Sequence, residues 1–238
     1  MGIHTTFVVL ISANAEWRVV HNYFPDCKIY TSPFGEWFSH HYKEFSELIE
    51  PIVFMHGGWG KVAAAASTQY VIDHWQPKIV INLGTCGGFE GETTRGEIIL
   101  ANKTIIYDIY EQMGDPDDHI LHYTTEIDTT WISKPYPIPV RCSLMVSGDR
   151  DLFSSEISKL KTNYGAIAGD WESGAIAWVS NINHTRILIL RGVTDIVGVE
   201  VGEAYNGNYS IYYENTEVIM KMLIDSLPQW LLKYFEYV

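Results

Sequence analysis

Apolar segments of strand length recur along the chain and alternate with stretches of helical composition. A continuous apolar run of about four to eight residues, bounded by turn residues, is typical of a buried strand. Alternation of such strands with helices favours a mostly parallel sheet that is covered by helices on both faces. Strands are predicted at Phe7–Ser12, Ile52–His56, Lys78–Leu83, Glu97–Ala101, Thr104–Tyr110, Arg141–Ser147, Ala166–Gly169 and Arg186–Arg191.

Helices are predicted between these strands. The clearest is Lys61–Trp75, which is rich in alanine, contains no proline or glycine, and is followed by Pro77. An earlier helix follows the first strand with Asn14 as its N-cap. The polar, acidic stretch Met113–Pro139 is expected to form a long loop or flap. Further helices are predicted at Ser154–Tyr164, Glu172–Asn181 and Ser210–Tyr237, the last of which Pro228 kinks or divides.

Composition and charge narrow the class of protein. The 238 residues are 47% hydrophobic, and 29 acidic against 16 basic residues give a net charge of −13. Binding to nucleic acid or to an anionic membrane surface requires a basic face, so neither partner is expected. No apolar run approaches the roughly 18–20 residues of a membrane span, and the first residues lack the pattern of a secretory leader. The three widely spaced cysteines indicate reduced thiols in the cytoplasm, and residues 1–238 are expected to form a single domain.

Polar and aromatic residues cluster just after several predicted strands. Ligands of α/β sheets bind beyond the carboxyl ends of the strands, so these positions are the candidate site. Each also has an ordinary structural explanation. In that explanation the glycine-rich segment forms a turn, Asp170 caps a helix, and Asp195 pairs with Arg191. Trp59 and Trp171 then belong to the core. The positions are Glu16–Arg18 after the first strand, Gly84–Gly88 after the third, Asp170–Glu172 at the head of a helix, and Arg191–Asp195.

Five short motifs follow one another along the chain: Gly58–Ala65, Asn82–Gly88 followed by Arg95–Ile98, Val146–Asp149, Ala168–Ala177 and Arg191–Asp195. As a set they resemble the motifs of the methylthioadenosine/S-adenosylhomocysteine nucleosidases, within the nucleoside phosphorylase superfamily. The resemblance covers the chain from about residue 7 to residue 235. It implies a three-layer α/β/α fold of the nucleoside phosphorylase type with a central mixed, partly barrel-like sheet.

The resemblance further implies cleavage of the N-glycosidic bond between a purine and a ribose. Positive charge develops on the sugar in the transition state, and an acid must protonate the departing purine at N7. Asp195 matches this acid, and its pKa would have to be raised by burial or by a neighbouring carboxylate. Glu172 matches the glutamate that takes the ribose hydroxyls and stabilises the cationic sugar. Adenine is the expected base because an aspartate rather than an asparagine faces the purine.

Other motif positions match substrate contacts of the family. Trp171 replaces a methionine that packs under the sugar, and Thr85 matches a hydroxyl beside the water or phosphate site. Near the place where the family stacks the purine, Arg150 and Asp151 interrupt the match. The substrate-binding residues expected from the resemblance are Thr85, Gly87, Leu152, Phe153, Asp170, Trp171 and Thr194.

Two positions depart from the family pattern. The hydrolases place a water-activating glutamate four residues beyond an alanine that matches Ala13, and without a gap this position is Trp17. Either Glu16 substitutes with a one-residue shift, or water activation differs or is absent. The phosphorylases place a phosphate-binding arginine where Asn82 stands, so its absence argues against phosphorolysis.

Three arginines, Arg18, Arg150 and Arg191, lie near the expected pocket of an otherwise acidic protein. They either form ordinary salt bridges or hold the phosphates of a nucleotide, for which Arg18 and Arg191 are the candidates. The spacing of His119 and His122 behind three aspartates allows a metal, but no predicted strand or helix frames them. No metal or redox cofactor is therefore expected.

The expected function is hydrolysis of a purine ribonucleoside or ribonucleotide, with Asp195, Glu172 and Glu16 as catalytic residues. A phosphate-dependent phosphorylase and a non-catalytic nucleoside-binding or storage protein are the alternatives. The resemblance also implies a homodimer or a higher homo-oligomer, to which the aromatic stretch Tyr107–Tyr110 is expected to contribute.

Overall fold

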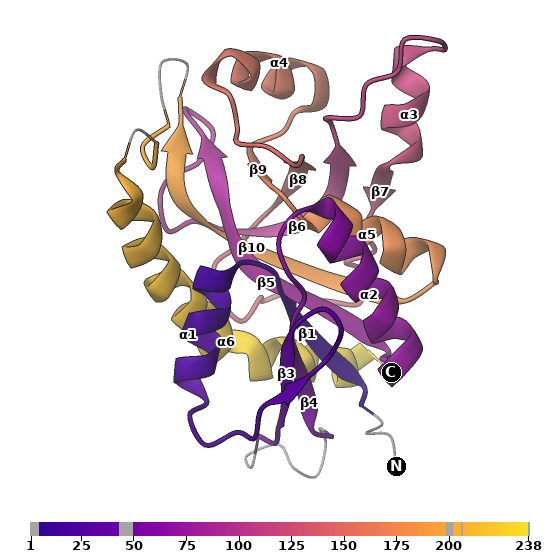
Figure 1. Ribbon diagram of the computed structural model, residues 1–238, viewed down its shortest axis with the longest axis vertical. Helices are drawn as coiled ribbons and strands as arrows, with labels where there is room; N and C mark the ends of the chain where they lie inside the picture. The colour runs from indigo at the N-terminus through magenta and orange to yellow at the C-terminus, as the bar shows by residue number, and fades with distance from the viewer. Residues whose placement is uncertain (1–4, 43–49, 199–201, 206, 238) are drawn as a thin grey trace.

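A computed structural model describes residues 5–42, 50–198, 202–205 and 207–237 (Figure 1). Ten strands within this part of the chain form one sheet. The strands are β1 (Phe7–Ile11), β2 (Tyr30–Thr31), β3 (Glu36–His40), β4 (Ile52–His56), β5 (Ile79–Phe89), β6 (Ile98–Ile106), β7 (Thr124–Glu126), β8 (Arg141–Ser147), β9 (Ala168–Asp170) and β10 (Arg186–Val197). The helices are α1 (Asn14–Tyr23), α2 (Lys61–Trp75), α3 (Pro116–His122), α4 (Ser154–Tyr164), α5 (Ser173–Ile182) and α6 (Tyr209–Tyr237).

Five of these strands close into a barrel. β5 pairs in parallel with β10, and β10 runs antiparallel to β6. β6 pairs in parallel with β8, β8 pairs in parallel with β9, and β9 returns antiparallel to β5. The sheet continues from β5 through β1, β4 and β3 to β2, while β7 pairs with β6. The sheet is therefore mixed and partly barrel-like, as the family resemblance implies, and not mostly parallel as the apolar pattern alone predicts.

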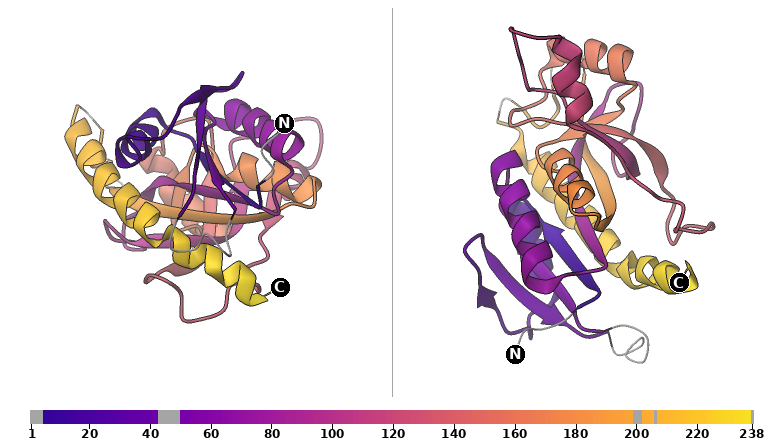
Figure 2. Two further views of the ribbon diagram at one scale, coloured as in Figure 1. Left: turned by 90° about the horizontal axis from the view of Figure 1, so that it is seen from below. Right: turned by 90° about the vertical axis from the view of Figure 1, so that its right-hand side faces the viewer.

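Helices cover the sheet on two sides (Figure 2). α1 and α6 pack together on one side, whereas α2 and α5 pack together on the other. In β1, Phe7 and Val9 belong to the core that includes α1 and α6, and Val8 and Leu10 belong to the core that includes α2 and α5. A strand that is buried on both faces has a continuous apolar sequence, which is why β1 could be predicted.

Several predicted elements are confirmed with the same bounds. Others differ, because local pattern does not reveal pairing partners. The predicted strands Glu97–Ala101 and Thr104–Tyr110 are one strand, β6, whose register against β8 shifts between Ala101 and Lys103. The elements with unchanged bounds are the helices Lys61–Trp75 and Ser154–Tyr164 and the strands Ile52–His56 and Arg141–Ser147.

The glycine-rich segment Gly84–Gly88 is not the predicted turn but part of β5. The parallel ladder between β5 and β10 continues through this segment to the end of both strands, and β10 accordingly extends past the predicted end at Arg191. A Cβ atom on Gly84 would collide with the guanidinium of Arg191, and one on Gly87 would lie 2.9 Å from Leu152 Cδ1. These glycines therefore allow close packing inside a strand, a use that differs from turn formation.

Other corrections concern loops and helix ends. The stretch Met113–Pro139 is not entirely a loop, because it contains α3 and β7. The β2–β3 pair was not predicted, and it forms an edge of the sheet where the rings of Tyr30 and Trp37 stack. Asn14 is the first residue of α1 and not its cap. α6 is not divided, since it continues through Pro228.

Candidate active site

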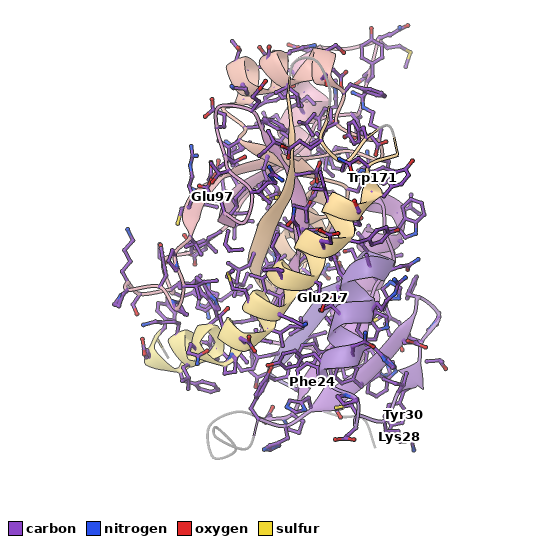
Figure 3. All side chains as sticks on the ribbon, turned by 90° about the vertical axis from the view of Figure 1, so that its left-hand side faces the viewer. Phe24, Lys28, Tyr30, Glu97, Trp171 and Glu217 are labelled. Carbon is purple, nitrogen blue, oxygen red and sulfur yellow. The ribbon has the colours of Figure 1, made fainter. Side chains whose placement is uncertain are left out.

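A cavity of about 710 Å³ opens where the beginnings of α1 and α6, the carboxyl-terminal parts of β5 and β10, and the turn after β9 meet. This volume suits a small organic ligand. Figure 3 shows Trp171 near the beginnings of α1 and α6. All the expected site residues line the cavity except Arg191 and Phe153. Those that line it are Glu16, Arg18, Thr85, Gly87, Leu152, Asp170, Trp171, Glu172, Thr194 and Asp195.

Arg191 lies fully buried behind the residues that line the cavity and binds three carboxylates. Its Nε is 2.9 Å from Asp170 Oδ2, and its terminal nitrogens lie 3.6 Å from Glu16 Oε1 and 3.7 Å from Glu172 Oε2. It also donates to Asn82 Oδ1 at 2.7 Å. The salt-bridge explanation of Arg191 is thus the one that the structure supports, although its partners do not include Asp195.

Glu16 lines the cavity, whereas Trp17 does not. Glu16 Oε1 accepts from the amide and the hydroxyl of Thr85 at 2.6 and 2.9 Å, and Oε2 accepts from Ala13 N at 3.1 Å. This last bond caps α1, because the side chain of Ala13 has no acceptor. Trp17 instead packs in the core, stacks on His56, and donates to Glu36. The carboxylate at this end of the cavity is therefore Glu16.

The carboxylate of Asp170 binds the start of α5 and supports the site. It accepts from Ser173 N at 3.1 Å, from Glu172 N at 3.3 Å, and from the hydroxyls of Ser147 and Ser173 at 2.6 and 2.9 Å. Five groups, counting Arg191, therefore hold one carboxylate in place. The N-cap of α5 is Glu172 and not Asp170, although Asp170 binds the first amide of the helix, and the same side chain anchors the buried guanidinium.

Glu172 follows Asp170 by two residues and is more weakly supported. Its Oε1 accepts from Gly60 N at 3.0 Å, and its Oε2 faces Arg191. The pKa of Glu172 is raised to about 8, chiefly because burial disfavours the charged form; Arg191 opposes this shift, while the charges of Asp170 and Glu16 add to it. At neutral pH these surroundings favour the protonated form of Glu172.

Asp195 lies on β10 just after a register shift between Val193 and Asp195. Thr194 donates a hydrogen bond of 2.7 Å to Asp195 Oδ1, which fixes the orientation of the carboxyl group. Burial raises the pKa of Asp195, the negative charges of Glu203 and Asp151 add to the effect, and the hydrogen bond from Thr194 opposes it. The fixed orientation and the raised pKa of Asp195 therefore favour a protonated carboxyl group.

The segment after β8 contributes Asp151 and Leu152 to the cavity, but not Phe153. Leu152 is held by a 3.1 Å hydrogen bond from Tyr205 to its carbonyl oxygen. Phe153 precedes α4, is half exposed, and lies beside the guanidinium of Arg150. Its side chain points away because the chain turns into α4 at this residue.

Trp59 and Trp171 are not core residues, as their rings meet at the cavity with centroids 5.5 Å apart. Arg18 lies at the mouth of the cavity and is exposed. Arg150 is bound to Glu156 at 2.9 Å and does not line the cavity. Of the three arginines considered from the sequence, Arg18 is therefore the one that lines the cavity.

Sequence reasoning missed four tyrosines. They lie between the end of β10 and the first turns of α6, and the available signal was the density of tyrosine in this segment. These cavity-lining residues are Tyr205, Tyr209, Tyr212 and Tyr213.

In the described part of the chain, no group of three His, Cys, Asp or Glu side chains is arranged to hold a metal ion. No helix in this part has the length and apolarity to cross a membrane.

Comparison with known proteins gives consistent results. The sequence model of the phosphorylase superfamily matches residues 31–224. The 5′-methylthioadenosine/S-adenosylhomocysteine nucleosidase of Thermotoga maritima is 28% identical over 162 residues, which are 68% of this chain and 73% of that protein. The nucleosidase of the same name from Halalkalibacterium halodurans is 30% identical over 172 residues, which are 65% of this chain and 72% of that protein.

A solved structure shows the same fold. The structure of the Helicobacter pylori 5′-methylthioadenosine/S-adenosylhomocysteine nucleosidase with butyl-thio-DADMe-Immucillin-A matches with a TM-score of 0.78. The match has 16% sequence identity and covers 95% of this chain and 99% of that chain. The likeness therefore extends over nearly the whole fold.

Proposed function

The chain belongs to the phosphorylase superfamily, and from this premise we propose that it hydrolyses the N-glycosidic bond of a purine ribonucleoside or ribonucleotide. Adenine is proposed as the base, since the similar proteins are nucleosidases of 5′-methylthioadenosine and S-adenosylhomocysteine. The observation that carries the proposal is that Asp195, Glu172 and the Glu16–Thr85 pair open into one cavity. A proton donor for the leaving purine, an anion for the sugar and a proton acceptor for the attacking water are thus available together.

Asp195 is the proposed acid for the leaving purine. Electrons of the breaking bond flow into the base, and protonation at N7 neutralises the charge that they bring. An acid for this step must still hold its proton near neutral pH, which the raised pKa of Asp195 favours. The hydrogen bond from Thr194 holds the carboxyl group in a fixed orientation, so less ordering is needed when the base leaves.

Glu172 is the proposed anchor of the ribose. The ionised carboxylate accepts hydrogen bonds from ribose hydroxyls and stabilises positive charge that develops on the sugar. Burial raises the pKa of Glu172, which favours the protonated form. Ribose hydroxyls that donate to the carboxylate and positive charge on the sugar favour the ionised form, so Glu172 releases its proton to water as the substrate binds, and its interaction with the sugar strengthens as the transition state forms. Trp171 lines the same cavity and is the proposed apolar surface under the ribose.

Glu16 is the proposed base for the attacking water. Its Oε1 is bound by Thr85 and faces Arg191, whereas Oε2 accepts only from Ala13 N among the described residues. A carboxylate oxygen has room for more than one donor, so Oε2 has capacity left for a water molecule. Water would lose a proton to Oε2 as its oxygen bonds to C1′ of the ribose.

Phosphorolysis is the weaker alternative for this site. Inorganic phosphate would have to approach Glu16, whose negative charge repels it. The nearest cation, Arg191, already binds the carboxylates of Asp170, Glu16 and Glu172. A storage protein would need the same pocket but no ordered base for water, and the Glu16–Thr85 contact argues against that alternative.

Arg18, at the mouth of the cavity, is the residue proposed to bind the 5′ group of the substrate. An exposed guanidinium there suits an anionic 5′ substituent such as a phosphate, so ribonucleotides stay in the proposed range. A single domain over the whole chain, a homodimeric or larger assembly, and a cytoplasmic location also remain part of the proposal. The closed barrel, and the strands whose residues belong to more than one core, support the first of these.

The test is release of free adenine from adenosine, methylthioadenosine, S-adenosylhomocysteine, AMP and ATP, with and without inorganic phosphate. We expect release that does not depend on phosphate, and a loss of about 10²- to 10⁴-fold in kcat for Asp195→Asn. Asp73→Asn, on the exposed face of α2, is the matched control and should leave turnover unchanged. Phosphate-dependent release would favour the phosphorylase, and tight binding without release would favour a storage protein.

A further inference from the structure

The segment 57–60, which joins β4 to α2, supplies the one hydrogen-bond donor that Glu172 has among the described residues. Gly60 N donates to Glu172 Oε1 at 3.0 Å. The same segment brings Trp59 to the cavity, where its ring meets that of Trp171. The position of segment 57–60 therefore affects both the proposed ribose anchor and the apolar surface beside it.

An ion pair lies directly after this segment. Lys61, the first residue of α2, binds Asp108 Oδ1 through its Nζ, and the two side chains are only 18% and 12% exposed. The backbone N–H of Lys61 donates to Asp149 Oδ1 at 2.5 Å, and Asp149 N donates to Asp108 Oδ2 at 2.8 Å. These three contacts form a closed ring that joins the start of α2 to the segments after β6 and β8.

Neither Lys61 nor Asp108 lines the cavity, so the pair acts on the site only through segment 57–60. Charges that are largely removed from water are costly unless they are paired and hydrogen-bonded, and here both oxygens of Asp108 have a donor. The backbone also lies close to the ring, since a Cβ atom on Gly60 would lie 3.1 Å from Asp149 Oδ1. The ring of contacts therefore restrains the segment at its Gly60 end.

We propose that Lys61 and Asp108 are positioning residues, which hold the Gly60 amide against Glu172 and so orient the proposed ribose anchor. Without the ion pair the start of α2 has one restraint fewer, and Glu172 loses its donor for part of the time. No covalent bond changes, and neither residue of the pair contacts the substrate. This inference rests on the hydrolytic function proposed above.

The charge state of Glu172 reports on the position of the Gly60 amide. Burial raises the pKa of Glu172, and the charges of Asp170 and Glu16 add to the effect. Arg191 and the hydrogen bond from Gly60 lower this pKa, because both stabilise the ionised form. A weaker bond from Gly60 should therefore raise the pKa of Glu172 above its value of about 8.

The experiment is a ¹³C NMR titration of the Glu172 carboxyl group in Lys61→Met and in Asp108→Asn, with the signal identified by its absence from Glu172→Gln. Methionine keeps an unbranched side chain without the charge, and the asparagine amide has one acceptor oxygen in place of two. We expect both variants to raise the pKa of Glu172 by about 0.5 to 1.0. We also expect kcat/KM for adenine release to fall about tenfold in both, because the ionised form that binds the ribose is less accessible.

Direct electrostatic action of the pair predicts a different result. Loss of the positive charge of Lys61 would raise the pKa of Glu172, whereas loss of the negative charge of Asp108 would lower it. The double variant leaves no unpaired charge and should show the same rise as the single variants, so the test holds if one of them does not fold. Lys103→Met is the matched control, because Lys103 pairs with Glu126 at 2.7 Å outside the cavity, and it should change neither the pKa nor kcat/KM.

An unchanged pKa of Glu172 in the variants, or shifts of opposite sign in Lys61→Met and Asp108→Asn, would overturn the inference. Raised pKa values with an unchanged kcat/KM would overturn it as well. The titration needs no turnover, so its result is separate from that of the activity assay. A wild-type protein that releases no base would overturn the proposed function, and the titration would still decide whether the pair positions Glu172.

Discussion

At the scale of single residues, the site buries more negative than positive charge. Glu16, Asp170 and Glu172 surround one guanidinium, that of Arg191. Glu16 accepts from two amides and a hydroxyl, and Asp170 accepts from two amides and two hydroxyls. Glu172 accepts only from Gly60 N among the described residues. The carboxylate with the fewest donors is the one that retains a proton, because desolvation there is least compensated.

The first residue-scale prediction is that Glu16, and not the neighbouring Trp17, acts in catalysis. Glu16→Gln should lower kcat for adenine release by about 10²-fold or more, because glutamine keeps the shape and cannot take the proton of water. Trp17→Phe should leave kcat within about threefold, since its ring is packed between β3 and β4 outside the cavity. Steady-state kinetics of both variants decide the matter. A larger loss for Trp17→Phe than for Glu16→Gln would contradict the assignment.

The second residue-scale prediction concerns stability and pH. The pKa of Glu172 is about 8 in the folded protein against 4.5 in the unfolded chain. Between these values the folded state holds a proton that the unfolded state has lost, so the free energy of unfolding falls as pH rises, by at most about 1.4 kcal/mol per pH unit. Glu172→Gln removes this dependence. Its advantage in stability over the wild type should therefore grow from pH 5 to pH 8.

Urea unfolding at pH 5, 6.5 and 8 measures this difference. Glu214→Gln, which replaces an exposed glutamate of α6, is the control and should follow the wild type at every pH. A Glu172→Gln variant whose stability difference from the wild type is the same at pH 5 and pH 8 would show that Glu172 is ionised throughout.

At the scale of elements, the sequence predicts what is local and misses what depends on partners. β1 and β4 are buried on both faces, so their apolar runs identify them directly. The end of β5 is not predictable in this way, because Gly84–Gly88 has the composition of a turn and becomes a strand only through its ladder with β10. β2 cannot be predicted from its sequence either, because its two residues are exposed and form a strand only through pairing with β3.

The candidate site follows the same rule. The carboxyl residues of the family-like motifs could be named from the sequence, and the structure brings Glu172, Asp195 and Glu16 to one cavity. The shift from Trp17 to Glu16 could not be decided from the sequence, because it depends on which side of α1 faces β5. Phe153 was misplaced because the direction of a side chain at a strand–helix junction depends on where α4 begins. Tyr212 was missed because α6 returns to β5 from far along the chain.

At the scale of the whole molecule, three apolar cores of the described residues are joined through shared strands. Neighbouring residues of β1 belong to the two larger cores, and β5 contributes to these two and, through Phe89, to the third core beneath α4. Neither layer of helices can separate from the sheet without exposing one face of these strands to water. The molecule should therefore unfold as one cooperative unit, even though its apolar side chains form three cores.

Val8→Ala and Val9→Ala test this whole-molecule prediction, because they are adjacent in β1 and face opposite cores. Each should lower the free energy of unfolding by about 2 kcal/mol, and both should leave a single transition. Tryptophan fluorescence reports on both larger cores, since Trp230 lies in one and Trp75 in the other, while circular dichroism reports on the backbone. The two signals should change together in the wild type and in both variants. If either valine variant shifted only one signal, the two layers would be separate folding units, and the proposed single domain would be wrong.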